Sequence, residues 1–213
     1  MPEAALLGKA CVLTIAEEAL VALSAALGTR DPERVRAALL AALPLASAEQ
    51  VEEVLLQAHL FIGFPDVLDA LSLWREVSRT AAPSESRGDE ALWEQRGEQI
   101  CAAVYGRNYE KLRSNVRALH PDLERWMLVG GYGRVLGREG LELVLRELAI
   151  AALLAVWGAP RQLHSHLRGA LNVGASLAAI DRAIAIAAAE ASPEDARAAE
   201  ALWAEVRERA GRR

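Results

Sequence analysis

The sequence predicts an all-α protein, on three observations. Apolar residues recur at helical spacing along most of the chain, no segment keeps a two-residue alternation, and helix-capping patterns separate the apolar stretches. The chain has 213 residues, 53% of them hydrophobic, which is enough to bury a core without disulfides or a metal. We therefore expect a helical protein with a large apolar core.

The N-terminal part predicts four helices in succession. A first helix covers 16–27, and Asp31-Pro32-Glu33 then supplies the N-cap, the N1 proline and the first-turn acid of a second. Ser47 and Gln50 have the spacing of a capping box for a third helix. Gly63-Phe64-Pro65 predicts a break, after which a further helix begins.

A small, polar segment over 80–88, TAAPSESRG, predicts a linker between an N-terminal half, 1–79, and a C-terminal half, 89–213. Prolines stand at the expected starts of three later helices. The helices expected in this half cover 89–105, 108–118, 121–135, 140–157, 160–173, 176–190 and 193–210.

Composition excludes several classes of protein. The net charge is −5 and the basic residues are scattered, which argues against nucleic-acid binding. The longest apolar run, 148–160, is too short for a bilayer, and no basic segment precedes the apolar N-terminus, so we expect a cytoplasmic protein without a membrane span. Cys11 and Cys101 are far apart and are read as buried small hydrophobes.

Polar groups interrupt two apolar helices that meet at a Gly-Ala-Pro break. Arg146 and Glu147 stand early in the first helix, and Gln162 and His166 lie one turn apart on the second. A carboxylate, an amide and an imidazole are therefore expected to converge where the helices pack. Such a cluster is a candidate acid/base site.

This segment resembles the core motif of the carboxymuconolactone decarboxylase family, whose relatives include the AhpD-type alkylhydroperoxidases. The resemblance starts at Arg96-Gly97 and implies an AhpD-like helical fold and assembly into a homo-oligomer, a dimer or a trimer; we expect no cofactor. The residues that carry it are Arg146-Glu147-Leu148, Gln162-Leu163, His166-Leu167-Arg168-Gly169-Ala170-Leu171-Asn172 and Gly174.

One departure from the family pattern concerns redox chemistry. The peroxidase branch has a Cys-x-x-Cys pair before the histidine, and those positions are Ala159 and Gln162 in this chain. Without thiols there is no nucleophile for a peroxide and no disulfide to recycle. The decarboxylase branch commonly has a glutamate at the position of Gln162, so the amide also departs from that branch.

His166 is the expected general acid/base, because an imidazole titrates near neutral pH. The resemblance implies a proton-relay role for Glu147, and Gln162 is expected to orient the imidazole or a substrate carbonyl. The structural alternatives are a hydrogen-bonded core histidine, a first-turn acid and an exposed helix glutamine. His164 lies about 200° around the helix from His166, so no metal site is expected.

Five further residues are candidates for substrate binding. Arg96 and Arg138 have the geometry to bind a substrate carboxylate, or alternatively hold ion pairs. The resemblance implies that the segment with Tyr132 and Arg134 borders the pocket. His59 lines the same pocket if the two halves interlock; otherwise it is a partly buried helix histidine.

The two halves also suggest an internal duplication, as two pseudo-repeated helical units. Residues 19–47 resemble 147–176, with Ala38 opposite His166, so the first copy keeps the packing face and lacks the polar site. The segment 52–65 resembles the family's closing helix and its aromatic-x-Gly-x-Pro turn, as if two incomplete units complement one another. Ala- and Leu-rich helices also resemble each other by composition alone.

Three functions remain open at this point. The first is a lyase of the carboxymuconolactone decarboxylase type, acting on a small carboxylated lactone or related organic acid. The second is a non-catalytic helical binding or assembly module of the same fold. The third, a thiol peroxidase, is disfavoured because the Cys-x-x-Cys pair is absent.

Overall fold

The computed structural model describes residues 12–85 and 88–211, and in these residues all regular structure is helical, as the sequence predicts. The elements in order are α1 (Ile15–Thr29), α2 (Pro32–Ala42), α3 (Ala48–Ser78), α4 (Glu90–Tyr105), a 3-10 turn η1 (Gly106–Asn108), α5 (Tyr109–Leu119), α6 (Pro121–Trp126), a π-helical segment η2 (Met127–Leu136), α7 (Leu143–Val156), α8 (Pro160–Asn172), α9 (Leu177–Glu190) and α10 (Pro193–Gly211).

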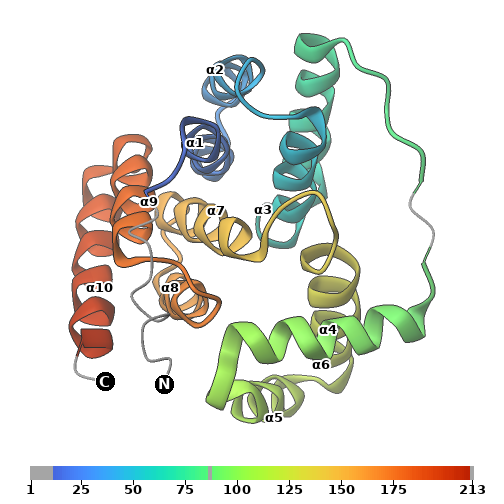
Figure 1. Cartoon of the computed structure of the whole chain (residues 1–213), viewed down its shortest axis with the longest axis vertical. Coiled ribbons are helices and arrows are strands. Elements are labelled where there is room, and N and C mark those ends of the chain that lie inside the picture. The colour runs from blue at the N-terminus through green and yellow to red at the C-terminus, as the bar shows by residue number, and fades with distance from the viewer. Residues whose placement is uncertain (1–11, 86–87, 212–213) are drawn as a thin grey trace, which may run out of the picture.

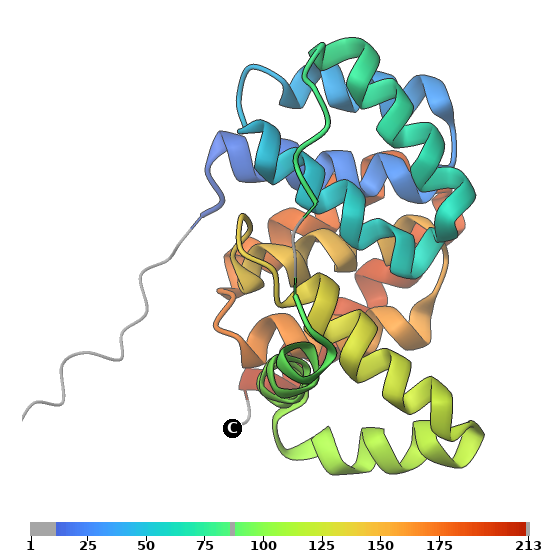
Figure 2. The same cartoon turned by 90° about the vertical axis from the view of Figure 1, so that its right-hand side faces the viewer.

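Helix α7 occupies the centre of the molecule. Figure 1 shows it surrounded by α1, α3, α8 and α9, while α10 covers α8 and α9 from outside. Helices α1–α3 lie toward one end of the long axis and α4–α6 toward the other (Figures 1 and 2). The two halves predicted from the sequence therefore meet along α7.

Local capping explains why the first elements begin where predicted. The Asp31 side chain accepts a hydrogen bond from the Glu33 backbone N–H, and Pro32 occupies the first turn of α2. Ser47 and Gln50 form the expected reciprocal capping box at the start of α3. Each cap satisfies backbone N–H groups that have no partner within the helix.

The break expected at 63–65 is a bend, because α3 resumes immediately beyond it. Gly63 adopts φ 82° and ψ 174°, a conformation that residues with a Cβ avoid. Among the described helices, α3 is the one long and apolar enough to cross a membrane, judged by length and composition. The bend divides it into two arms, each shorter than the roughly 20 residues that a span requires.

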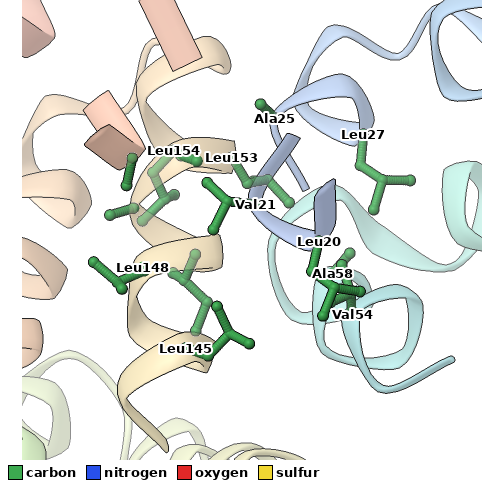
Figure 3. Close-up of a cluster of buried hydrophobic side chains, with 14 of the residues drawn as sticks. Leu20, Val21, Ala25, Leu27, Val54, Ala58, Leu145, Leu148, Leu153 and Leu154 are labelled. Carbon is green, nitrogen blue, oxygen red and sulfur yellow. The ribbon is translucent and has the colours of Figure 1, made fainter. Parts of the chain in front are cut away.

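The core is built on close contact between α1 and α7. Figure 3 shows Val21 of α1 between its own helix and α7, and Leu20 beside Val54 and Ala58 of α3. Ser24 Oγ donates to the Ala149 carbonyl at 2.7 Å, and a Cβ on Gly28 would lie 2.7 Å from the Leu153 carbonyl oxygen. Small residues on α1 therefore allow the two helix backbones to approach closely.

The helix predicted over 121–135 is present, and its second part, η2, is a π-helix rather than an α-helix. Glycines let this wider helix pack directly on α4. A Cβ on Gly133 would lie 1.9 Å from the Trp93 carbonyl oxygen, and one on Gly97 would lie 2.1 Å from the Leu128 carbonyl oxygen. The sequence-based prediction considered helical periodicity and missed this contact between two backbones.

Candidate functional site

A buried carboxylate–imidazole pair joins α7 to α8. His166 Nδ1 lies 2.9 Å from Glu147 Oε2, and the two residues are 6% and 0% exposed. Pro160 starts α8 and Gly158 turns the chain with φ 71°, so the two helices pack against each other with these side chains between them. Two of the three groups expected to converge therefore meet.

Gly169, one turn beyond His166 on α8, provides the space for the carboxylate. A Cβ on Gly169 would lie 2.5 Å from Glu147 Oε2 and 2.7 Å from Val104 Cγ1. Any larger residue would displace either the acid or α4. The close contact of α8 with α7 and α4 thus depends on this glycine.

The environment of Glu147 leaves one of its oxygens available. Oε1 is buried and has no hydrogen-bond partner among the described residues, while Oε2 contacts His166. Burial, with the nearby Glu147 charge, raises the pKa of Tyr105 to about 12 and that of Tyr132 well above 10. The phenols are therefore neutral near pH 7, and Oε1 remains an unused acceptor in the protein interior.

The N-terminal half supplies another wall of this site through α3. The Phe61 ring meets the His166 ring edge-on, with centroids 5.5 Å apart. One turn earlier, Gln57 Oε1 accepts from Arg146 Nη1 at 3.4 Å, and its buried Nε2 has no hydrogen-bond partner in the part of the chain that the structure describes. Site prediction missed both residues, although Glu53, Gln57 and Phe61 fall at helical spacing on one face of α3.

A second polar cluster lies beside the pair and ties α3 to α7. Glu53 accepts from Arg146 Nη2 at 2.8 Å and from Arg138 Nε at 2.8 Å. Arg146 is fully buried, and its Nε also donates to the Leu141 carbonyl at 3.2 Å. Arg138, expected at a substrate carboxylate, thus contacts a protein carboxylate, which was the alternative considered for it.

The remaining candidates lie in separate places. Gln162 is exposed at the start of α8, away from the buried pair. Arg96 Nε donates to the Gly133 carbonyl at 2.7 Å, and Arg134 is exposed with its guanidinium over the Trp93 ring. The chain therefore does not bring these three residues together with His166.

Two aromatic candidates differ in their distance from the pair. Tyr132 is buried, packs edge-on against Tyr105 and lies within the electrostatic reach of Glu147. His59 Nδ1 donates to the Leu56 carbonyl and its ring contacts Phe64, so Phe61 rather than His59 reaches His166.

Thiol and metal chemistry find little support in the described residues. Burial raises the pKa of the Cys101 thiol to about 12, so it stays protonated near neutral pH; Cys11 lies outside the described residues. Within 12–85 and 88–211, no cluster of three His, Cys, Asp or Glu side chains could hold a metal ion. His164 lines a surface groove, whereas His166 points into the core.

Comparison with known proteins agrees with the motif around His166. No curated protein matches the sequence. Residues 121–205, which run from α6 into α10 and contain both members of the buried pair, match the model of the carboxymuconolactone decarboxylase family. The chain therefore carries a carboxymuconolactone decarboxylase family region in residues 121–205, as the sequence motif predicted.

Proposed function

We propose that the protein is an acid/base enzyme of the carboxymuconolactone decarboxylase type that acts on a small carboxylated lactone or a related organic acid. The observation that carries the proposal is the 2.9 Å contact between His166 Nδ1 and Glu147 Oε2 inside the family region. An imidazole held by a buried carboxylate has a fixed tautomer and orientation, which general acid/base catalysis requires.

In the proposed reaction, the bond between the substrate carboxylate and its α-carbon breaks and CO2 leaves. The electron pair of that bond passes to the adjacent carbonyl as an enolate, and protonated His166 delivers a proton from Nε2 to carbon. Glu147 Oε2 accepts a hydrogen bond from the Nδ1–H group of His166, and its charge stabilises the imidazolium. Solvent then returns a proton to the imidazole.

The walls around the pair fit this chemistry. Phe61 packs against the His166 ring and limits its contact with water, which strengthens electrostatic interactions at the reacting nitrogen. Glu147 Oε1 and Gln57 Nε2 are a buried acceptor and a buried donor without hydrogen-bond partners within residues 12–85 and 88–211. Both are suited to hydrogen bonds with a polar substrate.

The test is CO2 release from a panel of carboxylated γ-lactones and related acids, followed with the purified chain. We expect His166→Ala to lower turnover of any accepted substrate by roughly 10²–10⁴-fold, the usual contribution of a general acid/base. Glu147→Gln should lower turnover less, because it keeps the side-chain shape. His120→Asn is the matched control, since this exposed histidine only caps α6 and asparagine also caps helices. Unchanged turnover in His166→Ala would contradict the mechanism.

A second candidate is a non-catalytic helical module of the same fold. The complete burial of Glu147 favours it, because a buried ion pair can also serve as a packing element. In this case no acid in the panel would be consumed or would raise the melting temperature, while His166→Ala would still destabilise the fold.

We further propose that the two halves are diverged copies, each with its own helical hairpin. Extended beyond 19–47, the register sets Glu18 opposite Arg146 and Glu53 opposite Arg182. In the structure Glu18 forms an ion pair with Arg182, and Arg146 forms one with Glu53. These pairs link α1 to α9 and α7 to α3, so each crosses between the copies. On this proposal, only the second copy retains a polar site.

The same register pairs two tryptophans. Trp74 Nε1 donates to Glu52 Oε1 at 3.1 Å, and Trp203 Nε1 donates to Asp181 Oδ1 at 2.7 Å. Trp203 and Asp181 are the residues that the register sets opposite Trp74 and Glu52. This repeated contact supports an equivalence of the two arms of α3 with α9 and α10.

A further inference from the structure

The side-chain amide of Gln57 in α3 is held in one orientation. Gln57 is 1% exposed, and its Oε1 accepts a hydrogen bond from Arg146 Nη1 of α7 at 3.4 Å. A guanidinium group only donates hydrogen bonds, so the oxygen of the amide faces Arg146 and its nitrogen points away. Arg146 is itself fixed, because its Nη2 donates to Glu53 Oε2 at 2.8 Å and its Nε donates to the Leu141 carbonyl at 3.2 Å.

The nitrogen of this amide is a buried donor that the protein does not use. Gln57 Nε2 carries two N–H groups, and it has no hydrogen-bond partner among the described residues. Apolar residues fill neighbouring buried positions of α3, since Val54 and Ala58 are both 0% exposed. Because a buried donor without an acceptor destabilises the fold, its presence at position 57 indicates a partner that arrives with a ligand.

This donor lies one helical turn from the contact with His166. Residues four apart on a helix are neighbours, with about 5–6 Å between their Cβ atoms, so Gln57 and Phe61 share one face of α3. The Phe61 ring meets the His166 ring edge-on. Helix α3 lies beside α7 (Figure 1), where Glu147 directly follows Arg146. Gln57 is therefore a neutral donor on the α3 side of the buried pair.

The proposed decarboxylation requires a donor that the buried pair does not supply. When CO2 leaves, negative charge develops on the carbonyl oxygen of the substrate. Ionised Glu147 only accepts hydrogen bonds, and His166 is occupied with proton transfer to carbon. A fixed N–H group in a water-poor site binds a charged oxygen more strongly than a neutral carbonyl, so it stabilises the transition state more than the substrate.

We propose that Gln57 Nε2 donates to the substrate carbonyl and stabilises its oxygen as CO2 leaves. The inference rests on the proposed function and narrows its substrate class. The carboxyl group must be on the carbon next to a lactone or ketone carbonyl, or on a carbon conjugated with it, so that the electron pair of the broken bond reaches the oxygen held by Gln57. His166 then protonates carbon and the carbonyl forms again. Gln57 lies outside residues 121–205, so the N-terminal half contributes a catalytic residue to the family region.

The first test compares CO2 release by two variants that carry the same chemical change on α3. Gln57→Glu keeps the shape of the side chain and an oxygen toward Arg146, but it replaces the amide donor by a carboxylate. It should lower kcat about 10²–10³-fold, with a much smaller change in KM. Gln50→Glu is the matched control, because glutamate also completes the capping box that Gln50 forms, and it should leave kcat unchanged. The substrates are γ-lactones with the carboxyl group on the α-carbon; their isomers with the carboxyl group on the β-carbon should release no CO2.

A second measurement does not require turnover. γ-Butyrolactone, which has the carbonyl and no carboxyl group, is added to the full chain, and the side-chain N–H signals of Gln57 are followed by NMR. They should shift saturably in the parent and in His166→Ala. A shift in a parent that turns over no acid would contradict the proposed activity and support Gln57 as the donor to the carbonyl. Loss of turnover in His166→Ala but not in Gln57→Glu, or no saturable shift of the Gln57 signals, would overturn the inference.

Discussion

The hairpin of α1 and α2 and the hairpin of α7 and α8 share their turn features and have different interiors. Both turn through a left-handed residue, Arg30 with φ 57° and Gly158 with φ 71°, and both second helices start with a proline. The second hairpin buries Glu147 against His166, whereas the first has Ala38 at the position that the register sets opposite His166. A hairpin of this kind therefore folds without the polar pair.

The two ion pairs that link the proposed copies differ in the same direction. Arg146 and Glu53 are buried, with side-chain exposures of 0% and 4%, while Arg182 and Glu18 are 48% and 28% exposed. Removing one partner of a buried ion pair leaves the other charge in the core without compensation, whereas water solvates the charge that remains from an exposed pair. The ion pair that includes α7, the helix of the candidate site, is thus the buried one.

The largest expected effect comes from removing the buried member of these ion pairs. Arg146→Met leaves Glu53 without its shortest contact to α7 and should reduce the free energy of unfolding by about 3–5 kcal/mol. Arg182→Met, the matched change in the exposed pair, should leave it nearly unchanged. Urea unfolding of both variants measures the difference. Equal losses would show that burial does not distinguish the two pairs.

A smaller effect is expected when the second hairpin is made to resemble the first. Glu147→Ala leaves His166 Nδ1 without its hydrogen-bond partner in the core, and His166→Ala leaves the Glu147 carboxylate without its partner. Each change should lower the free energy of unfolding by about 1–3 kcal/mol or more. The double variant should cost less than the sum of the two, because both polar groups are then gone. Urea denaturation of the four proteins gives the coupling energy, expected at about 0.5–3 kcal/mol. Additive losses would mean that the pair is not an interacting unit.

The sequence predicts those parts of the molecule that depend on neighbours along the chain. Helix starts at Pro32 and Ser47 follow from capping, and the contact of His166 with Glu147 follows from two apolar helices joined by a short turn. Gln162 shows the limit of such reasoning. Helical spacing predicts which side of α8 the Gln162 side chain is on, but it does not predict whether a neighbouring helix covers that turn of α8. In the structure Gln162 is exposed.

The rest of the site depends on contacts between distant segments, which periodicity does not encode. Arg138 was expected to bind substrate, and its guanidinium contacts Glu53 on a helix from the other half. Phe61 of α3 contacts His166 because α3 packs against α7, and the surface groove lined by His164 exists because α4, α5 and α8 meet. A single sequence gives the charge of each residue but not the residue that it contacts, so the partners of Arg138 and Phe61 became known only from the structure.

The smallest expected effect concerns pH and again separates the copies. Burial, followed by the Arg168 charge, lowers the pKa of His164 from 6.5, with Glu205 opposing and Arg209 adding to the shift. Just below pH 6.5 the unfolded chain therefore binds more protons than the folded chain. The contribution of His164 to the free energy of unfolding is complete above pH 6.5, and it declines as the pH falls through the lowered pKa. The register sets Arg36 opposite His164.

Arg36 is charged throughout this range and forms an ion pair with Glu76, whose pKa it lowers from 4.5 through a hydrogen bond. That contribution is complete above pH 4.5 and is lost only as the pH falls through the lowered value. We therefore expect the stability of His164→Asn to approach or exceed that of the parent as the pH is lowered from 6.5 to 5. The stability of Arg36→Gln should follow the pH dependence of the parent down to pH 4.5 and differ from it only below that pH. Thermal unfolding from pH 8 to 3.5 distinguishes the two windows. A parent stability that does not change relative to that of His164→Asn across pH 6.5 would show that folding does not lower the pKa of His164.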